Sequence, residues 1–164
     1  HLRPEDVKRF KELGVVASMQ PFHVVDDARW AEGRIGKKRC ESSYAYRSLL
    51  DAGAVLAFGS DWPVVPLDVP AGIDAAVNRR SLDGKNPGGW FPAQKITVEE
   101  AIAAYTTGSA FAGFQEKERG SLTPGKVADF VLLSRDILAK GERDKIADTK
   151  VTLTVVGGKV VYGK

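Results

Sequence analysis

Asp61 is the residue of this chain best placed for chemistry, because it follows a short apolar run that stops abruptly. The run covers residues 55–58 and is followed by Gly-Ser-Asp and then by a helix-breaking Trp-Pro pair. A carboxylate at the carboxyl end of a buried strand can bind a metal or act as a general base, since the strand holds its Cα rigidly while the loop leaves its oxygens accessible. An aspartate after Gly-Ser is also typical of a turn or a helix cap. Taken alone, the pattern leaves both interpretations open.

The elements that would position Asp61 form two similar units, each a helix, a glycine and an apolar strand. Residues 4–13 have Pro at a first helical position, acids in the first turn and apolar residues about one turn apart, and residues 15–19 then form a continuous apolar run. Residues 44–52 and 54–58 repeat this order around Gly53. Continuous apolar strands favour a parallel sheet covered on both faces, which is the α/β class. Both strands deliver polar residues at their carboxyl ends.

The remaining segments predict one helix, a long irregular stretch and a small β element. Thr97 to Glu100 is a capping box followed by apolar residues at helical spacing. Beyond Gly120 the chain turns to β signals, with one strand over residues 128–133 and two over 151–162 that join at a Gly-Gly pair. Residues 64–95 are rich in Pro and Gly and are interpreted as irregular and functional or partly disordered.

Composition limits the classes of function. The formal net charge is +3, but basic and acidic residues are interleaved without a basic stripe, so we expect no nucleic-acid partner. One cysteine, Cys40, excludes an internal disulfide and a Cys-x-x-Cys site. No apolar run has the roughly 20 residues of a membrane span, and no signal-peptide pattern follows His1, so we expect a cytoplasmic protein without a membrane partner. Because the chain starts with His rather than Met, we expect its start to be either processed or cut from something longer.

Several short segments follow one another in a distinctive order along essentially the whole chain. They are residues 17–23 (ASMQPFH), 34–36 (RIG) with Arg39, 49–54 (LLDAGA), 59–64 (GSDWPV), 75–79 (AAVNR), Glu100-Ala101 with Tyr105-Thr106, 120–130 (GSLTPGKVADF) and 155–162 (VVGGKVVY). In this order they resemble the carboxyl-terminal portion of the metal-dependent amidohydrolase superfamily, specifically the YtcJ-like branch, amidohydrolase family 3.

The resemblance implies a fold and an activity. It implies the carboxyl-terminal part of a (β/α)₈ TIM barrel over residues 1–118, containing about the last two strands, and part of a β-sandwich over residues 119–164. It also implies a hydrolase of carbon–nitrogen bonds, in non-peptide or cyclic amides of small molecules, that uses a metal-activated water. Asp61 matches the strand-eight aspartate, which by resemblance ligates a divalent metal, usually zinc, and takes a proton from the attacking water.

The chain departs from the family pattern in its missing ligands. A barrel needs about 250 residues and eight strands. The His-x-His pair of strand one and the histidines of strands five and six have no counterpart, since His1 and His23 are the only histidines. A catalytic zinc site uses three protein ligands plus water. We therefore expect the isolated chain to be inactive, with no tightly bound metal; an improvised site of His23, Asp61 and Cys40 is the alternative.

Four further residues are candidates for substrate binding. Gln20 offers an amide donor and acceptor, His23 lines the pocket by position and resemblance, Trp62 forms its wall and Arg79 binds a substrate carboxylate. Each has a simpler interpretation: a strand-end hydrogen-bond partner for Gln20, a surface-loop histidine for His23, packing for Trp62 and a solvated helix end for Arg79.

Two other hypotheses stay open beside the hydrolase segment. The chain could be a catalytically silent fold used for assembly or ligand binding. Alternatively, a partner chain could supply the missing strands, because half a barrel exposes strand edges and apolar faces that favour self-association or pairing with the missing part of the barrel.

Overall fold

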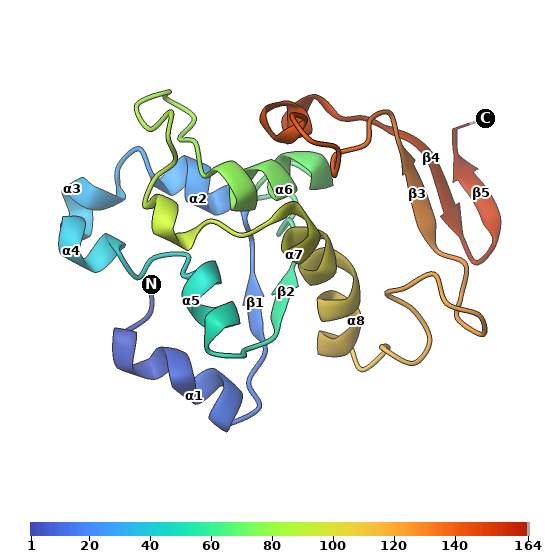
Figure 1. Ribbon diagram of the computed structural model, residues 1–164, viewed down its shortest axis with the longest axis horizontal. Helices are drawn as coiled ribbons and strands as arrows, with labels where there is room; N and C mark the ends of the chain where they lie inside the picture. Colours follow the sequence, from blue (N-terminus) through green and yellow to red (C-terminus); the bar gives the residue numbers. More distant parts are fainter. Residues whose placement is uncertain (164) are drawn as a thin grey trace.

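The computed structural model describes residues 1–163 and contains two separate sheets (Figure 1). In the first sheet, β1 (Ala17–Met19) pairs with β2 (Leu56–Phe58) in parallel, with Ala17 opposite Leu56 and Met19 opposite Phe58. All three residues of β2 are buried, as a strand covered on both faces requires. The predicted parallel pairing is confirmed, so the segments that follow β1 and β2 leave the sheet at the same edge.

Helices of the amino-terminal two-thirds surround this sheet, and most are short. The first predicted helix begins as a 3-10 turn and continues as α1. This helix ends shortly before Gly14, whose φ is +64°. The predicted helix before β2 is α5. The bounds are η1 Pro4–Asp6, α1 Val7–Glu12, α2 Phe22–Asp27, α3 Ala31–Ile35, α4 Lys37–Cys40 and α5 Tyr46–Asp51.

The stretch over residues 64–95 was wrongly interpreted as irregular throughout, since it contains the ten-residue helix α6 (Val69–Asn78) and the 3-10 turn η2 (Pro92–Gln94). Asp68 caps α6 by accepting a hydrogen bond from the Ala71 amide, and Pro70 lies in the first turn, where proline is tolerated. Gly72 faces the Tyr105 hydroxyl so closely that a Cβ there would collide with it. The Pro and Gly that indicated a loop therefore begin a helix and permit its packing.

The helix after Thr97 runs as one continuous segment with a π-helical middle. It comprises α7 (Val98–Ala103), η3 (Ala104–Gly108) and α8 (Ser109–Ala112). The predicted capping box is confirmed: the Glu100 amide donates to Thr97 Oγ1 at 3.2 Å and the Thr97 amide donates to Glu100 Oε2 at 2.8 Å.

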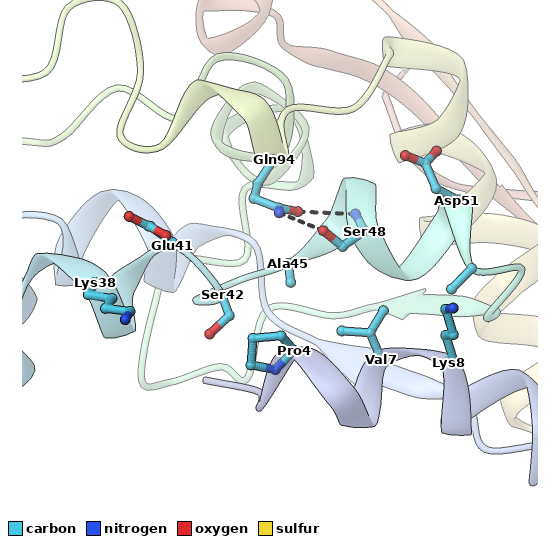
Figure 2. A pocket seen from close by; sticks show the side chains of 11 residues that line it. Pro4, Val7, Lys8, Lys38, Glu41, Ser42, Ala45, Ser48, Asp51 and Gln94 are labelled. Carbon is cyan, nitrogen blue, oxygen red and sulfur yellow. Dashed lines mark hydrogen bonds between the residues drawn. The ribbon is translucent and has the colours of Figure 1, made fainter.

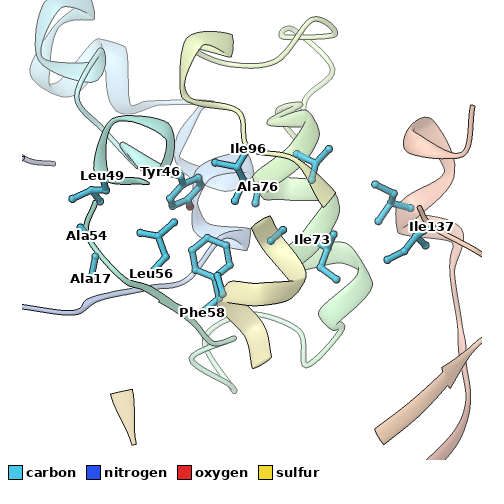
Figure 3. Close-up of a cluster of buried hydrophobic side chains, with 14 residues drawn as sticks. Ala17, Tyr46, Leu49, Ala54, Leu56, Phe58, Ile73, Ala76, Ile96 and Ile137 are labelled. Carbon is cyan, nitrogen blue, oxygen red and sulfur yellow. The ribbon is translucent and has the colours of Figure 1, made fainter. Parts of the chain in front are cut away.

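The main hydrophobic core joins the first sheet to the helices that cover it (Figure 3). Phe58 of β2 lies at its centre, with its ring edge-on to Tyr46 at 5.2 Å and to Tyr105 at 5.5 Å between centroids. The other fully or nearly fully buried members include Ala17, Leu49, Leu56, Ile73, Ala76, Val77, Ala101 and Ala104. This core holds β2, and with it the start of the loop that carries Asp61.

The second sheet lies to one side and is antiparallel (Figure 1). Its strands are β3 (Phe130–Leu133), β4 (Val151–Val156) and β5 (Lys159–Tyr162), in that order. The hairpin at Gly157-Gly158 is confirmed, with φ values of +59° and +76° that suit glycine. The 3-10 segment η4 (Arg143–Asp148) packs against α6. The predicted boundary between residues 118 and 119 falls between α8 and β3 and stays a prediction.

None of the helices within residues 1–163 combines the length and apolar character needed to cross a bilayer.

Candidate functional site

Asp61 lies in a tight turn directly after β2. Its φ is +61°, in the left-handed region that aspartate adopts more readily than most residues, and its carbonyl oxygen accepts a hydrogen bond from the Val64 amide at 2.9 Å. Ser60 Oγ accepts a hydrogen bond from the Trp62 amide at 3.3 Å. The Asp61 side chain is 52% exposed, so its oxygens are accessible at the end of a strand that is itself buried. Backbone conformations of this kind are concentrated at functional sites.

His23 faces Asp61 from the neighbouring strand end. It lies in the first turn of α2, directly after β1, and its Nε2 is 3.9 Å from Asp61 Oδ2. That nitrogen is buried and has no hydrogen-bond partner among the described residues, although a buried ring nitrogen normally has one. Because parallel strands end at one edge of the sheet, two residues 38 positions apart in sequence become neighbours.

Gln20 and Trp62 lie beside these two residues in the chain and differ in exposure. Gln20 is half-buried at the end of β1, where its carbonyl oxygen accepts the His23 amide at 3.2 Å. Trp62 is 63% exposed, and the peptide bond to Pro63 is cis. Val64 and Leu67 continue the same segment and are also largely exposed. The segment after Asp61 thus presents an apolar surface, and the substrate-binding roles of Gln20 and Trp62 stay predictions.

Arg79 is completely buried, which differs from the solvated helix-end arginine that was the alternative. It follows α6 at a φ of +55°, and its guanidinium donates to the carbonyl oxygens of Trp90 at 2.7 Å, Tyr44 at 3.0 Å and Ser43 at 3.3 Å. The guanidinium also lies 5.4 Å from the centroid of the Tyr46 ring. Burial lowers the pKa of Arg79 to about 10. Arg79 therefore joins three chain segments, and its role in substrate binding stays a prediction.

The described residues do not form a complete metal site. No group of three His, Cys, Asp or Glu side chains within residues 1–163 is arranged to hold an ion. The improvised site of His23, Asp61 and Cys40 is therefore wrong, since Cys40 is buried in a separate apolar cluster with Val24 and Ala28. Burial raises the pKa of its thiol, which makes it a poorer ligand. Asp61 fits a divalent metal as one carboxylate ligand, and further donors would have to come from outside these residues.

One residue that sequence analysis missed secures the end of β2. Ser109 Oγ lies 2.9 Å from the carbonyl oxygens of both Phe58 and Ala104, so it ties α8 to the last residue of the strand. A single serine within a helix carries no sequence signal for such a contact, because serine hydroxyls commonly bond to the backbone of their own helix.

A groove away from Asp61 lacks the chemistry of the Asp61 site (Figure 2). It has a volume of about 520 Å³ and runs between α1 and α5. Ser48 and Gln94 meet at its wall. Gln94 Oε1 accepts a hydrogen bond from the backbone amide of Ser48 at 3.1 Å, and Gln94 Nε2 donates to Ser48 Oγ at 2.7 Å. These groups satisfy one another, and neither His23 nor Asp61 lines the groove.

Comparison with known proteins assigns the chain to a family. The model of an amidohydrolase family, Amidohydro_3, matches residues 1–162. The chain belongs to this amidohydrolase family. The metal-dependent amidohydrolase resemblance of the sequence is thereby confirmed.

Three curated relatives align with this amidohydrolase chain. It is 40% identical over 163 residues to Protein LONG AFTER FAR-RED 3 of Arabidopsis thaliana, covering 99% of the chain and 27% of the relative. It is 34% identical over 160 residues to the putative amidohydrolase YtcJ of Bacillus subtilis (98% and 30%). It is 31% identical over 121 residues to the N-substituted formamide deformylase of Arthrobacter pascens (73% and 21%). The chain thus spans less than a third of the length of each relative.

A solved structure supports the same relationship. An uncharacterized metal-dependent hydrolase from Pyrococcus furiosus superposes with a TM-score of 0.72 at 36% sequence identity, over 84% of this chain and 27% of that chain. The mixed α/β amidohydrolase chain therefore shares its fold with part of a metal-dependent hydrolase.

Proposed function

We propose that this chain forms the last two strands of a (β/α)₈ barrel, with β1 as strand seven and β2 as strand eight, and that β3 to β5 form part of an adjoining β-sandwich. The parallel pairing of β1 and β2 and the helical segment after each strand support this assignment. In such barrels the catalytic groups lie at the carboxyl ends of the strands. Asp61 and His23 lie at the carboxyl ends of these two strands.

The proposed function is the hydrolysis of a carbon–nitrogen bond of a small amide, with Asp61 as the catalytic carboxylate. The single observation that carries it is the accessible Asp61 carboxylate at the end of β2, 3.9 Å from an unpartnered His23 nitrogen. A bound divalent metal, zinc by preference, would supply Lewis acidity and an attacking water of lowered pKa. Asp61 accepts the proton of the attacking water and passes it to the leaving nitrogen, which leaves poorly unless protonated.

The other residues near Asp61 orient the reacting groups. His23 presents Nε2 toward the same space and is suited to hydrogen-bond either the carboxylate or the substrate. Trp62 would form an apolar wall and Gln20 would offer an amide to the substrate. The amidohydrolase relative that removes formyl groups from N-substituted formamides supports an amide-type substrate.

The chain by itself is proposed to be inactive and to need the remainder of a barrel. Its described residues supply fewer than the three protein donors that a catalytic zinc site requires. Apolar side chains of the second sheet are exposed, among them Val131, Leu132, Val160 and Val161. Exposed strands of this kind favour pairing with the missing part of the barrel and sandwich, or self-association.

The experiment that tests the proposal is the substitution Asp61→Asn in the complete protein that contains this chain. Asp51→Asn is the matched control, because Asp51 ends α5 near the amino end of β2 and its side chain is 65% exposed. We expect Asp61→Asn to abolish hydrolysis of N-substituted formamides and to lower the bound metal measured by elemental analysis, whereas Asp51→Asn does neither. Full activity of the Asp61→Asn protein would refute the assignment.

A further inference from the structure

Another groove lies at the start of α7, and more basic than acidic side chains line it. It has a volume of about 370 Å³ and is lined by residues 95–99 together with Arg47 of α5, Val77 of α6 and Arg143 of η4. Arg47 is paired there, with its guanidinium 2.8 Å from both Asp51 and Glu100. All of these elements belong to this chain, so the groove requires no other subunit.

Lys95 and Arg143 form no ion pair with any carboxylate of residues 1–163. Lys95 Nζ donates to the carbonyl oxygen of Gly88 at 2.8 Å. Arg143 donates through Nη2 to the carbonyl oxygen of Val77 at 2.5 Å and through Nε to Asn78 Oδ1 at 3.0 Å. These contacts hold both side chains in place while part of their donor capacity is unused, since an ammonium has three donors and a guanidinium five.

The surroundings of Lys95 disfavour its positive charge. Burial lowers the pKa of Lys95, and the guanidinium groups of Arg143, Arg80 and Arg79 lower it further. Asp144 acts in the opposite direction, but it is ion-paired with Arg80. An anion in the groove would relieve this repulsion.

We propose that the groove between Lys95 and Arg143 binds a phosphate group, either as inorganic phosphate or as a phosphate monoester. Nη1 of Arg143 is not used in the contacts with Val77 and Asn78, and it can donate to a tetrahedral oxyanion. Lys95, which lines the same groove, adds a point charge. The groove is separate from the Asp61 site, because neither Asp61 nor His23 lines it. Glu99 opposes the binding of an anion, because its exposed carboxylate also lines the groove and repels negative charge.

Titration of the complete protein that contains this chain with inorganic phosphate at constant ionic strength, followed by calorimetry, tests the proposal. We expect saturable binding that Lys95→Gln weakens by roughly five- to tenfold, the range of one charge-assisted hydrogen bond. Lys126→Gln is the matched control, because Lys126 also donates to backbone carbonyls, of Glu116 and Arg119, outside the groove. Glu99→Gln should tighten binding, because it removes the repelling charge.

The outcomes separate clearly. Binding that falls in Lys95→Gln, rises in Glu99→Gln and is unchanged in Lys126→Gln supports the site, and a parallel titration with glycerol phosphate shows whether an ester binds more tightly than the free ion. Absence of saturable binding, or equal effects of Lys95→Gln and Lys126→Gln, overturns it. Arg143→Gln is not the primary variant, because Arg143 also secures the end of α6.

Discussion

Nε2 of His23 lies 3.9 Å from Oδ2 of Asp61, across the ends of two parallel strands. Nε2 is buried and has no hydrogen-bond partner in the described part of the chain, so a group placed between these side chains would satisfy it. This relationship connects the fold to the proposed chemistry, because the parallel pairing of β1 and β2 brings the ends of the two strands together.

Replacing His23 should impair the reaction without unfolding the protein. His23→Asn in the complete protein is expected to lower kcat by roughly 10- to 100-fold, the range found for groups that orient a metal ligand. The melting temperature should change little, because the orphaned nitrogen makes no hydrogen bond that the variant would lose. Steady-state kinetics beside a thermal melt provide the check, and an unchanged kcat would count against any role in catalysis.

Arg79 should be essential to stability. Arg79→Met leaves three backbone carbonyl acceptors without their donor in a buried site, so we expect a loss of about 3–5 kcal/mol in the free energy of unfolding. Arg80→Met is the matched control at the next position, where an ion pair with a largely exposed Asp144 contributes at most about 1 kcal/mol. Urea titrations measure both, and similar values for the two variants would contradict the structural role of Arg79.

Gly108 should tolerate no side chain. A Cβ at this position would collide with the carbonyl oxygen of Leu56, which is backbone and cannot move aside without disturbing β2. Gly108→Ala is therefore expected to destabilise the chain by about 1–3 kcal/mol. Gly33→Ala in α3 meets open space and should instead stabilise slightly, by about 0.5–1 kcal/mol. Denaturant unfolding measures both changes in the free energy of unfolding. A loss in Gly108→Ala together with a gain in Gly33→Ala would support the contact between Gly108 and Leu56.

Asp74 should make stability depend on pH in a defined direction. Burial raises the pKa of Asp74 above 3.8, although the hydrogen bond from Asn78 opposes this. The folded chain therefore holds the proton more tightly than the unfolded chain, and the contribution of Asp74 to stability falls as pH rises through the window just above 3.8. Asp74→Asn should gain in stability relative to the wild type between about pH 3 and pH 6. Urea unfolding of both proteins at several pH values in that range gives the difference in their free energies of unfolding. A difference that does not change with pH, or that changes in the opposite direction, would contradict the burial of Asp74.

The amino-acid sequence by itself determined the local features of this protein. The Thr97 capping box, the Gly157-Gly158 hairpin and the end of β2 before Asp61 each depend on neighbours within a few positions along the chain. Such signals are complete within a short segment, because capping and turn formation involve only nearby backbone groups. The order of these segments was also sufficient to indicate the family.

Only the tertiary structure decided which distant side chains meet. It buried Arg79 against Trp90 and Tyr44, placed Cys40 in an apolar cluster away from Asp61, and showed that Pro70 and Gly72 belong to a helix. The physical reason is that burial and long-range contacts depend on how helices pack over the sheet, and the residue types around each position do not encode that packing locally. The meeting of His23 and Asp61 depends on both, since local signals ended each strand and parallel pairing joined the ends.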